Sequence, residues 1–103
     1  MRIKAKLKNG VIEVKAMARH EMMTYDIAEK KTGSRDNANF IVHLSATVGG
    51  TTVLDASTSQ FLSKNPIFMF KFKAADKFKK GDEVVMTWVD LKGKTVTSKE
   101  KIK

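Results

Sequence analysis

The sequence predicts an all-β fold, namely an immunoglobulin-like antiparallel β-sandwich of about seven strands without a disulfide. Three observations support this prediction. Apolar and polar residues alternate with period two over most of the chain, two-residue turn signals join several of these segments, and no convincing helical pattern interrupts them. The length of 103 residues is usual for one domain and the sequence shows no internal repeat or low-complexity segment, so we expect a single domain spanning residues 1–103.

Two hairpins are predicted from their turns. Residues 2–8 alternate cleanly, and Asn9-Gly10 follows, which favours a type I′ turn because both positions then need positive φ. Residues 11–19 form the return strand. Residues 39–48 alternate in the same way, with Phe40, Val42 and Leu44 expected on one inner face. Gly49-Gly50 then turns the chain into a strand over residues 51–56.

Residues 66–73 predict a strand with one aromatic face. Phe68, Phe70 and Phe72 fall on that face, while Ile67 and Met69 fall on the other. We expect this strand to be the central one, around which the other segments pack. Asn-Pro before it is a turn signal, and Phe61-Leu62 is expected to dock on the sandwich before that turn.

Residues 83–90 and 95–98 supply the last two predicted strands. The first of these is apolar on both faces, so it is either central or covered by an interface. The segment 20–37 has no alternation and carries Met22, Met23 and Tyr25. Its methionines either fill one end of the sandwich or contact a partner.

The residue inventory argues against catalysis. The chain has no cysteine and only two histidines, His20 and His43, and it lacks a nucleophile elbow or a glycine-rich phosphate loop. His43 lies on the polar face of its strand and is expected to be exposed or paired across strands. We therefore predict a protein that is not an enzyme and that has no cofactor.

The formal net charge of +9 favours anionic partners. One alternative function is a copper site, because His20 with Met17, Met22 and Met23 combines imidazole and thioether ligands. A second alternative is a basic nucleic-acid-binding domain, which would need exposed aromatic residues for base stacking. An acidic protein surface is the third possible partner.

Several segments together resemble the SoxZ family of bacterial thiosulfate oxidation. They are the opening hairpin over residues 2–15, Phe40-Ile41, the turn Ser63-Lys64-Asn65-Pro66 with Phe70-Lys71-Phe72-Lys73 after it, Lys80-Gly81-Asp82, and Trp88-Val89-Asp90 with Gly93. The resemblance extends over nearly the whole chain. In one place the chain departs from the family pattern: after His20 the family usually continues with proline, whereas Glu21-Met22-Met23 follows here.

The resemblance implies a structural subunit that pairs as a heterodimer with a SoxY-like carrier protein, whose cysteine on a mobile arm holds sulfur intermediates. It also implies transient docking to other Sox pathway proteins, without nucleic acid or membrane as a partner. No signal peptide is expected at the N-terminus, and the resemblance implies a periplasmic location reached by export with the partner. Methionine and tyrosine are enriched at interfaces. We therefore expect the partner to contact Met17, Met22, Met23, Tyr25, Met69 and Met86.

Overall fold

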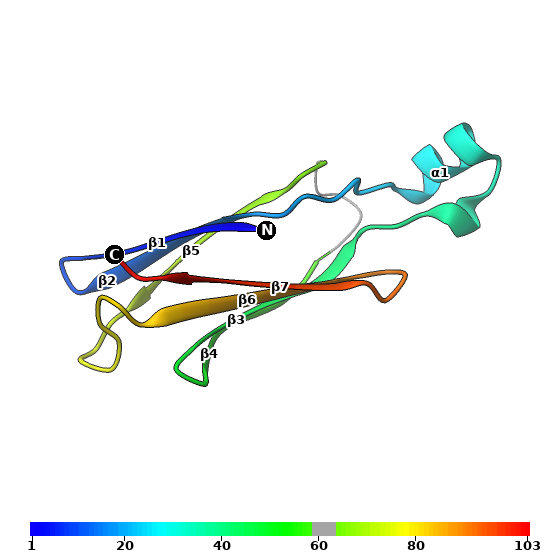
Figure 1. Cartoon of the computed structure of the whole chain (residues 1–103). Coiled ribbons are helices and arrows are strands. Elements are labelled where there is room, and N and C mark those ends of the chain that lie inside the picture. Colours follow the sequence, from blue (N-terminus) through cyan, green and yellow to red (C-terminus); the bar gives the residue numbers. More distant parts are fainter. Residues whose placement is uncertain (59–63) are drawn as a thin grey trace.

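Two antiparallel sheets pack face to face in the computed structural model, which describes residues 1–58 and 64–103 (Figure 1). One sheet has the order β1–β2–β5, from β1 (Arg2–Lys8), β2 (Val11–Met17) and β5 (Ile67–Lys73). The other has the order β4–β3–β6–β7, from β4 (Thr51–Ser57), β3 (Ile41–Val48), β6 (Glu83–Asp90) and β7 (Thr95–Lys101). Within these residues the predicted all-β sandwich of seven strands is confirmed.

Both predicted two-residue turns are confirmed. Asn9 and Gly10 have φ values of 55° and 76°, and Gly49 and Gly50 have φ values of 56° and 82°. Positive φ at both central positions is the signature of a type I′ turn, whose twist matches that of the flanking strands. The turns fix the register, so that Lys8 lies opposite Val11 in one hairpin and Val48 lies opposite Thr51 in the other.

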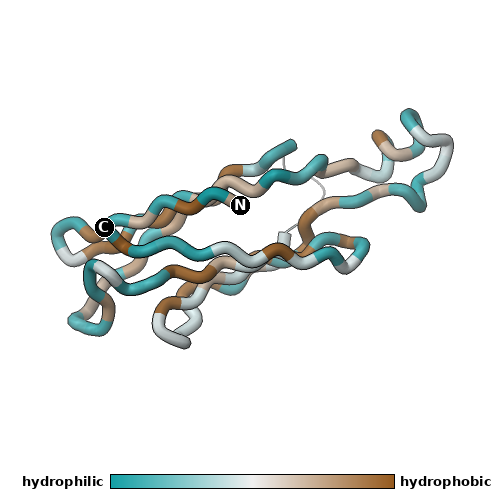
Figure 2. Tube along the Cα trace, in the orientation of Figure 1, coloured by the Kyte–Doolittle hydropathy of each residue, from teal (hydrophilic) through white to brown (hydrophobic). Residues whose placement is uncertain are grey.

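The core lies between the sheets, where the alternating side chains of both meet. From the three-stranded sheet it receives Ile12 and Val14, and from the four-stranded sheet Leu44, Met86 and Trp88, each at most 2% exposed. Hydrophobic and hydrophilic residues alternate along the strands in Figure 2, as this packing requires. Burying a side chain of this size contributes about 1.5–3 kcal/mol, which makes these inward positions the main source of stability.

The prediction that residues 66–73 form the central strand is wrong. The strand β5 exists and its three phenylalanines do face inward, but β5 lies at the edge of its sheet, beside β2 only. An edge strand has one neighbour instead of two, and Phe68, Phe70 and Phe72 are accordingly only half-buried. In this sheet the central position belongs to β2. The expectation for residues 83–90 is met, since β6 lies between β3 and β7.

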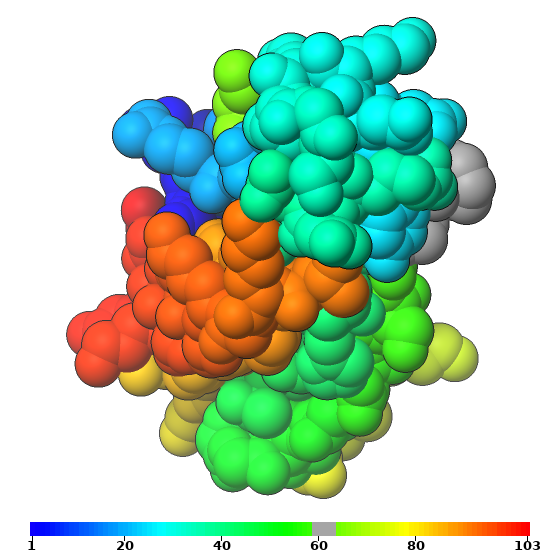
Figure 3. Space-filling view, turned by 90° about the vertical axis from the view of Figure 1, so that its right-hand side faces the viewer, coloured from blue at the N-terminus to red at the C-terminus, as the bar shows by residue number. Residues whose placement is uncertain are grey.

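The segment 20–37 contains a helix that the sequence analysis did not predict. Helix α1 spans Tyr25–Thr32, and its first turn is capped by the Thr24 hydroxyl, which accepts the N–H of Ile27 at 3.2 Å. Gly33 ends it with a φ of 80° and donates its N–H to the Glu29 carbonyl at 2.9 Å. A short 3₁₀ turn, η1 (Arg35–Asn37), follows. Figure 3 shows this region (cyan) over one end of the molecule.

Two smaller corrections concern β3 and the C-terminus. The register of β3 against β6 shifts between Ile41 and His43, so Ile41 is fully buried and Val42 is only half-buried. The last strand runs to Lys101 and is longer than the predicted strand over residues 95–98. Beyond it Ile102 is buried, and Lys103 exchanges backbone hydrogen bonds with β1, accepting from Leu7 at 2.8 Å and donating to Ala5 at 3.0 Å. These two hydrogen bonds join the residues after β7 to β1, and so connect the two sheets.

Candidate functional site

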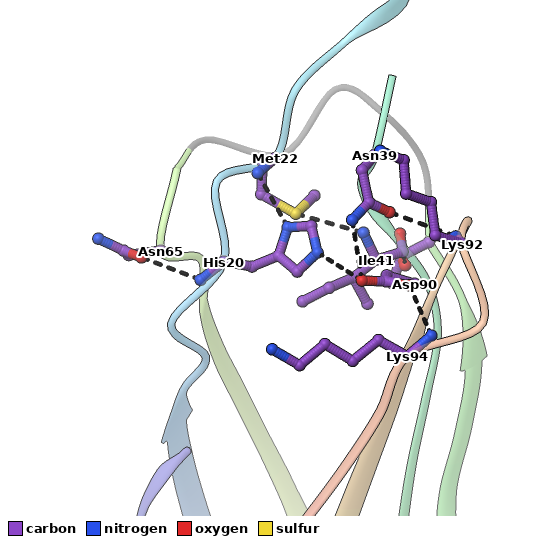
Figure 4. A network of polar contacts seen from close by, with 9 residues as sticks. His20, Met22, Asn39, Ile41, Asn65, Asp90, Lys92 and Lys94 are labelled. Carbon is purple, nitrogen blue, oxygen red and sulfur yellow. Dashed lines mark hydrogen bonds and ion pairs between the residues drawn. The ribbon is translucent and has the colours of Figure 1, made fainter. Parts of the chain in front are cut away.

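A buried polar cluster lies at the end of the sandwich where α1 begins (Figure 4). His20 follows β2 and is 7% exposed, and its Nε2 lies 3.1 Å from Oδ2 of Asp90 at the end of β6. The other ring nitrogen, Nδ1, accepts the backbone N–H of Met22 at 2.9 Å. Because Nδ1 accepts, the proton of the neutral imidazole belongs on Nε2, which donates to Asp90.

Asp90 is the acceptor that joins the cluster together. Besides His20 it accepts the Asn39 side-chain N–H at 3.0 Å on Oδ2 and the backbone N–H of Lys94 at 2.8 Å on Oδ1. Burial raises the pKa of Asp90, but the hydrogen bonds from His20, Asn39 and Lys94 lower it, and the net pKa lies below the ordinary value. The carboxylate therefore stays ionised and holds the β6–β7 turn against the segments before β3 and after β2.

The His20 ring also has an apolar neighbour. The ring of Trp88 meets it edge-on, with 5.2 Å between centroids and an interplanar angle of 87°. Edge-to-face packing of this kind adds about 0.5–1.5 kcal/mol to burial alone. All the observed contacts of His20 thus hold the end of the sandwich together.

The turn singled out by the family resemblance contacts this cluster. Lys64 is exposed, whereas the Asn65 side chain accepts the His20 N–H at 3.0 Å and Pro66 is buried. The Pro66 carbonyl accepts the Ala18 N–H at 3.0 Å, which continues the pairing of the segments around β2 and β5. Ser63, as well as Phe61-Leu62, lies outside the described residues. The described part of the turn anchors the end of β2.

The surroundings of His20 give little support to the copper alternative. Both ring nitrogens are engaged by protein groups, and the thioether of Met22 lies 3.3 Å from the backbone N–H of Ile41, which donates to it. Met17 lies on the outer face of its sheet with 43% exposure, away from the buried ring. In the residues that the structure describes, no group of three or more His, Cys, Asp or Glu side chains could hold a metal ion.

The six side chains predicted to contact a partner lie in three different settings. Met22 and Met86 are buried in the core, 3% and 0% exposed, so a partner docking on this fold does not reach them. Met23, just before α1, and Tyr25, the first residue of α1, are half-buried, and Tyr25 packs edge-on against Phe40 with 5.6 Å between ring centroids. Met17 and Met69 are exposed on the outer face of the three-stranded sheet. The structure therefore does not bring the six together into one surface.

The outer faces of the two sheets differ in charge. We call the outer face of the three-stranded sheet the basic face, since its exposed side chains include Arg2, Lys4, Lys6, Lys8, Lys15, Lys71 and Lys73. Its carboxylate is that of Glu13, whose Oε2 lies 3.9 Å from the Lys71 ammonium. Like charges gathered on one face raise the local potential and steer anionic partners toward it.

The outer face of the four-stranded sheet carries few charges, and these lie on its two edge strands and at the start of β6. We call it the threonine-rich face, and its members are Ser45, Thr47, Thr52, Ser57, Val85, Thr87, Val89, Thr95 and Thr97. Its charged side chains are Asp55 on β4, Lys99 and Lys101 on β7, and Glu83 at the first position of β6, opposite Lys101. Asp55 is paired with His43. His43 thus has the cross-strand partner expected from the sequence. The middle of this face, over Ser45, Thr47, Val85, Thr87 and Val89, lacks the charge that normally covers an exposed sheet.

Comparison with protein families identifies the chain. The model of the family described as sulphur oxidation protein SoxZ matches residues 1–101. The chain belongs to the SoxZ family. It therefore has a role in sulfur oxidation, and the suspected resemblance is confirmed. No curated protein matches this SoxZ-family chain. Among the described residues, no helix is long and apolar enough to cross a membrane.

The groupings that the fold creates are not visible in the sequence. His20, Asn65 and Asp90 lie in three separate segments, and their spacing in the sequence does not indicate that they meet. The basic face had a signal, because Arg2, Lys4, Lys6 and Lys8 alternate with apolar residues. The sequence did not show that β2 pairs with β5. This pairing adds Lys71 and Lys73 to the same face.

Proposed function

We propose that this SoxZ-family chain is the non-catalytic partner subunit of a SoxY-like carrier, with which it forms a heterodimer. The observation that carries the proposal is the family match over residues 1–101 in a chain that has no cysteine. A chain without a thiol cannot bear the sulfur intermediate itself, so the sulfur-bearing cysteine belongs to the partner. The subunit acts by position: it holds the carrier and presents the carrier's arm to the enzymes of the pathway.

The threonine-rich face is the surface we propose for this permanent pairing. The centres of stable interfaces are depleted in charged side chains, and on the two inner strands of this face, β3 and β6, the charged or titratable side chains are Glu83 at the first position of β6 and the His43 imidazole near the start of β3; the positions between them are uncharged. Val85, Thr87 and Val89 are half-buried and uncharged, so a second sheet packed on these three side chains buries no charge at the centre of the contact.

The pairing is tested by co-expression with a SoxY-like protein and by measuring the mass of the complex in solution. We expect an equimolar complex. Thr87→Lys places a charge at the centre of the proposed interface and is expected to weaken the pairing at least about tenfold, because the ammonium would be buried without a partner. Lys4→Thr on the basic face is the control and leaves the complex intact.

The possible outcomes distinguish an error in the proposed function from an error in the proposed interface. A chain that stays monomeric in the presence of the carrier contradicts the proposed function itself. A complex that tolerates Thr87→Lys as well as Lys4→Thr keeps the function and contradicts the assignment of the threonine-rich face.

We also propose a periplasmic location, reached by export together with the carrier. The support is the family membership. Fractionation of cells that express the chain with and without a signal-bearing carrier tests it. Periplasmic chain is expected only when the carrier is present, and export of the chain alone contradicts the proposal.

A further inference from the structure

The basic face combines a regular array of cations with an apolar corner. The strand registers place its outward side chains in four rows of three across β1, β2 and β5. Seven of these side chains are basic and a single one is acidic, so the face concentrates much of the chain's net charge of +9. The rows are Arg2–Met17–Ile67, Lys4–Lys15–Met69, Lys6–Glu13–Lys71 and Lys8–Val11–Lys73.

The apolar corner occupies one end of this face. Met17 lies directly opposite Ile67, and Met69 is the next outward residue of β5, so the three side chains are neighbours. They are 43%, 51% and 61% exposed, the values of side chains that project into solvent. Exposed apolar side chains that cluster beside charges are typical of protein contact surfaces, and methionine adapts its shape to a partner.

A groove lies on the β1 side of the basic face. Its volume is about 610 Å³, and it is lined by Lys4, Lys6 and Lys15 together with the carboxylates of Glu13 and Glu100. Cations on its walls can receive acidic side chains, while the two carboxylates fix where a cation or a neutral group must lie opposite them.

From these observations we propose that the basic face docks the acidic surface of a second protein, which inserts an apolar side chain at the Met17–Ile67–Met69 corner. The proposal deepens the proposed function and rests on it in one respect: a carrier bound to the threonine-rich face leaves the opposite sheet free for a transient partner. Attraction between opposite charges speeds such encounters without making them permanent.

The position of Glu13 favours a protein over a polyanion. It lies in an inner row between Lys6 and Lys71, where a nucleic-acid backbone or an anionic membrane would meet a repelling carboxylate. The outward positions of these three strands also carry no aromatic residue for base stacking and one arginine among the seven basic side chains. A protein surface can instead place a neutral or basic group opposite Glu13.

The test uses the full chain and a synthetic peptide rich in glutamate with a central leucine pair. Binding is followed by peptide fluorescence anisotropy and by amide chemical shifts of the chain. We expect shifts confined to β1, β2 and β5. The double variant Lys4→Glu, Lys15→Glu should lower affinity at least about tenfold, since each reversed charge turns an attraction into a repulsion. Met69→Ala, or alanines in place of the leucine pair, should lower it about threefold.

The matched control makes the same change in charge elsewhere. Lys30→Glu, Lys31→Glu reverses two cations at the end of α1, and we expect it to change affinity less than about threefold. Equal losses in the two double variants would mean that net charge alone is read, and would overturn the proposal. A preference for single-stranded DNA or for phosphatidylglycerol vesicles over the peptide would overturn it as well.

Failure here is distinguishable from failure of the proposed function. The Lys4→Glu, Lys15→Glu variant is expected to pair with the SoxY-like carrier as the unaltered chain does, because both substitutions lie on the sheet opposite the threonine-rich face. A chain that pairs with the carrier but does not bind the peptide would contradict only the docking surface proposed here.

Discussion

Asn65 and His20 exchange two hydrogen bonds: the His20 N–H donates to Asn65 Oδ1 at 3.0 Å, and the Asn65 N–H donates to the His20 carbonyl at 2.9 Å. Asn65 does this with a φ of 51°, in the left-handed region that asparagine tolerates better than most residues. The turn that resembled the family is thus a clamp on the chain that leaves β2, and His20 in turn contacts Asp90.

Replacing Asn65 tests this clamp. Asn65→Ala removes the side-chain acceptor and strains the positive φ, so we expect the free energy of unfolding to fall by about 1–3 kcal/mol. Asn65→Gly loses the same acceptor but adopts positive φ freely, so the strain is absent and its loss should be smaller. Urea unfolding of both variants measures the difference, and equal stability of Asn65→Ala and the unaltered chain would contradict the role of the turn.

The ionised state of Asp90 predicts a dependence of stability on pH. Its pKa is lowered in the folded chain, so the unfolded chain binds more protons as the pH falls below the ordinary carboxylate value of about 3.9. The stabilisation from this group is present above that value and is lost as the pH falls through the folded pKa. Asp90→Asn should remove this part of the acid sensitivity, as measured by unfolding at a series of pH values.

Asp90→Asn also has a cost at neutral pH. The amide keeps one acceptor oxygen, and its NH₂ group must face a donor, either Lys94 at the Oδ1 position or His20 and Asn39 at the Oδ2 position. We therefore expect a loss of about 1–3 kcal/mol. Glu21→Gln, a change at an exposed carboxylate, is the control and should alter neither the stability nor its acid profile. An unchanged acid profile in Asp90→Asn would contradict the lowered pKa.

How far the sequence predicts this fold depends on how local each signal is. The Asn9-Gly10 and Gly49-Gly50 turns and the alternation in β1, β2 and β6 are local, and each was predicted correctly. The edge position of β5 is not local, because period two shows which residues face inward but does not show how many strands flank them. The aromatic face therefore suggested a central strand that the pairing does not support.

Helix α1 was missed for a different reason. It has eight residues and one buried member, Ala28, so it shows no apolar stripe by which a helix is usually found. Its end signals were present nonetheless: Thr24 before the first turn, Asp26 within it, and Gly33 after Lys30 and Lys31. The polar cluster could not be predicted in this way, since His20 and Asp90 are 70 positions apart and meet only through the packing of the two sheets.

Two methionines of the predicted interface now have opposite expected behaviour. Met86 is fully buried between the sheets, so Met86→Ala leaves a cavity and should lower the free energy of unfolding by about 2–5 kcal/mol. Met69 is 61% exposed on the basic face, so Met69→Ala should change stability by less than about 0.5 kcal/mol. Parallel urea unfolding curves compare the same chemical change in both places. A stability loss in Met69→Ala as large as that in Met86→Ala would mean that Met69 is packed in the fold, and would remove it from the docking surface.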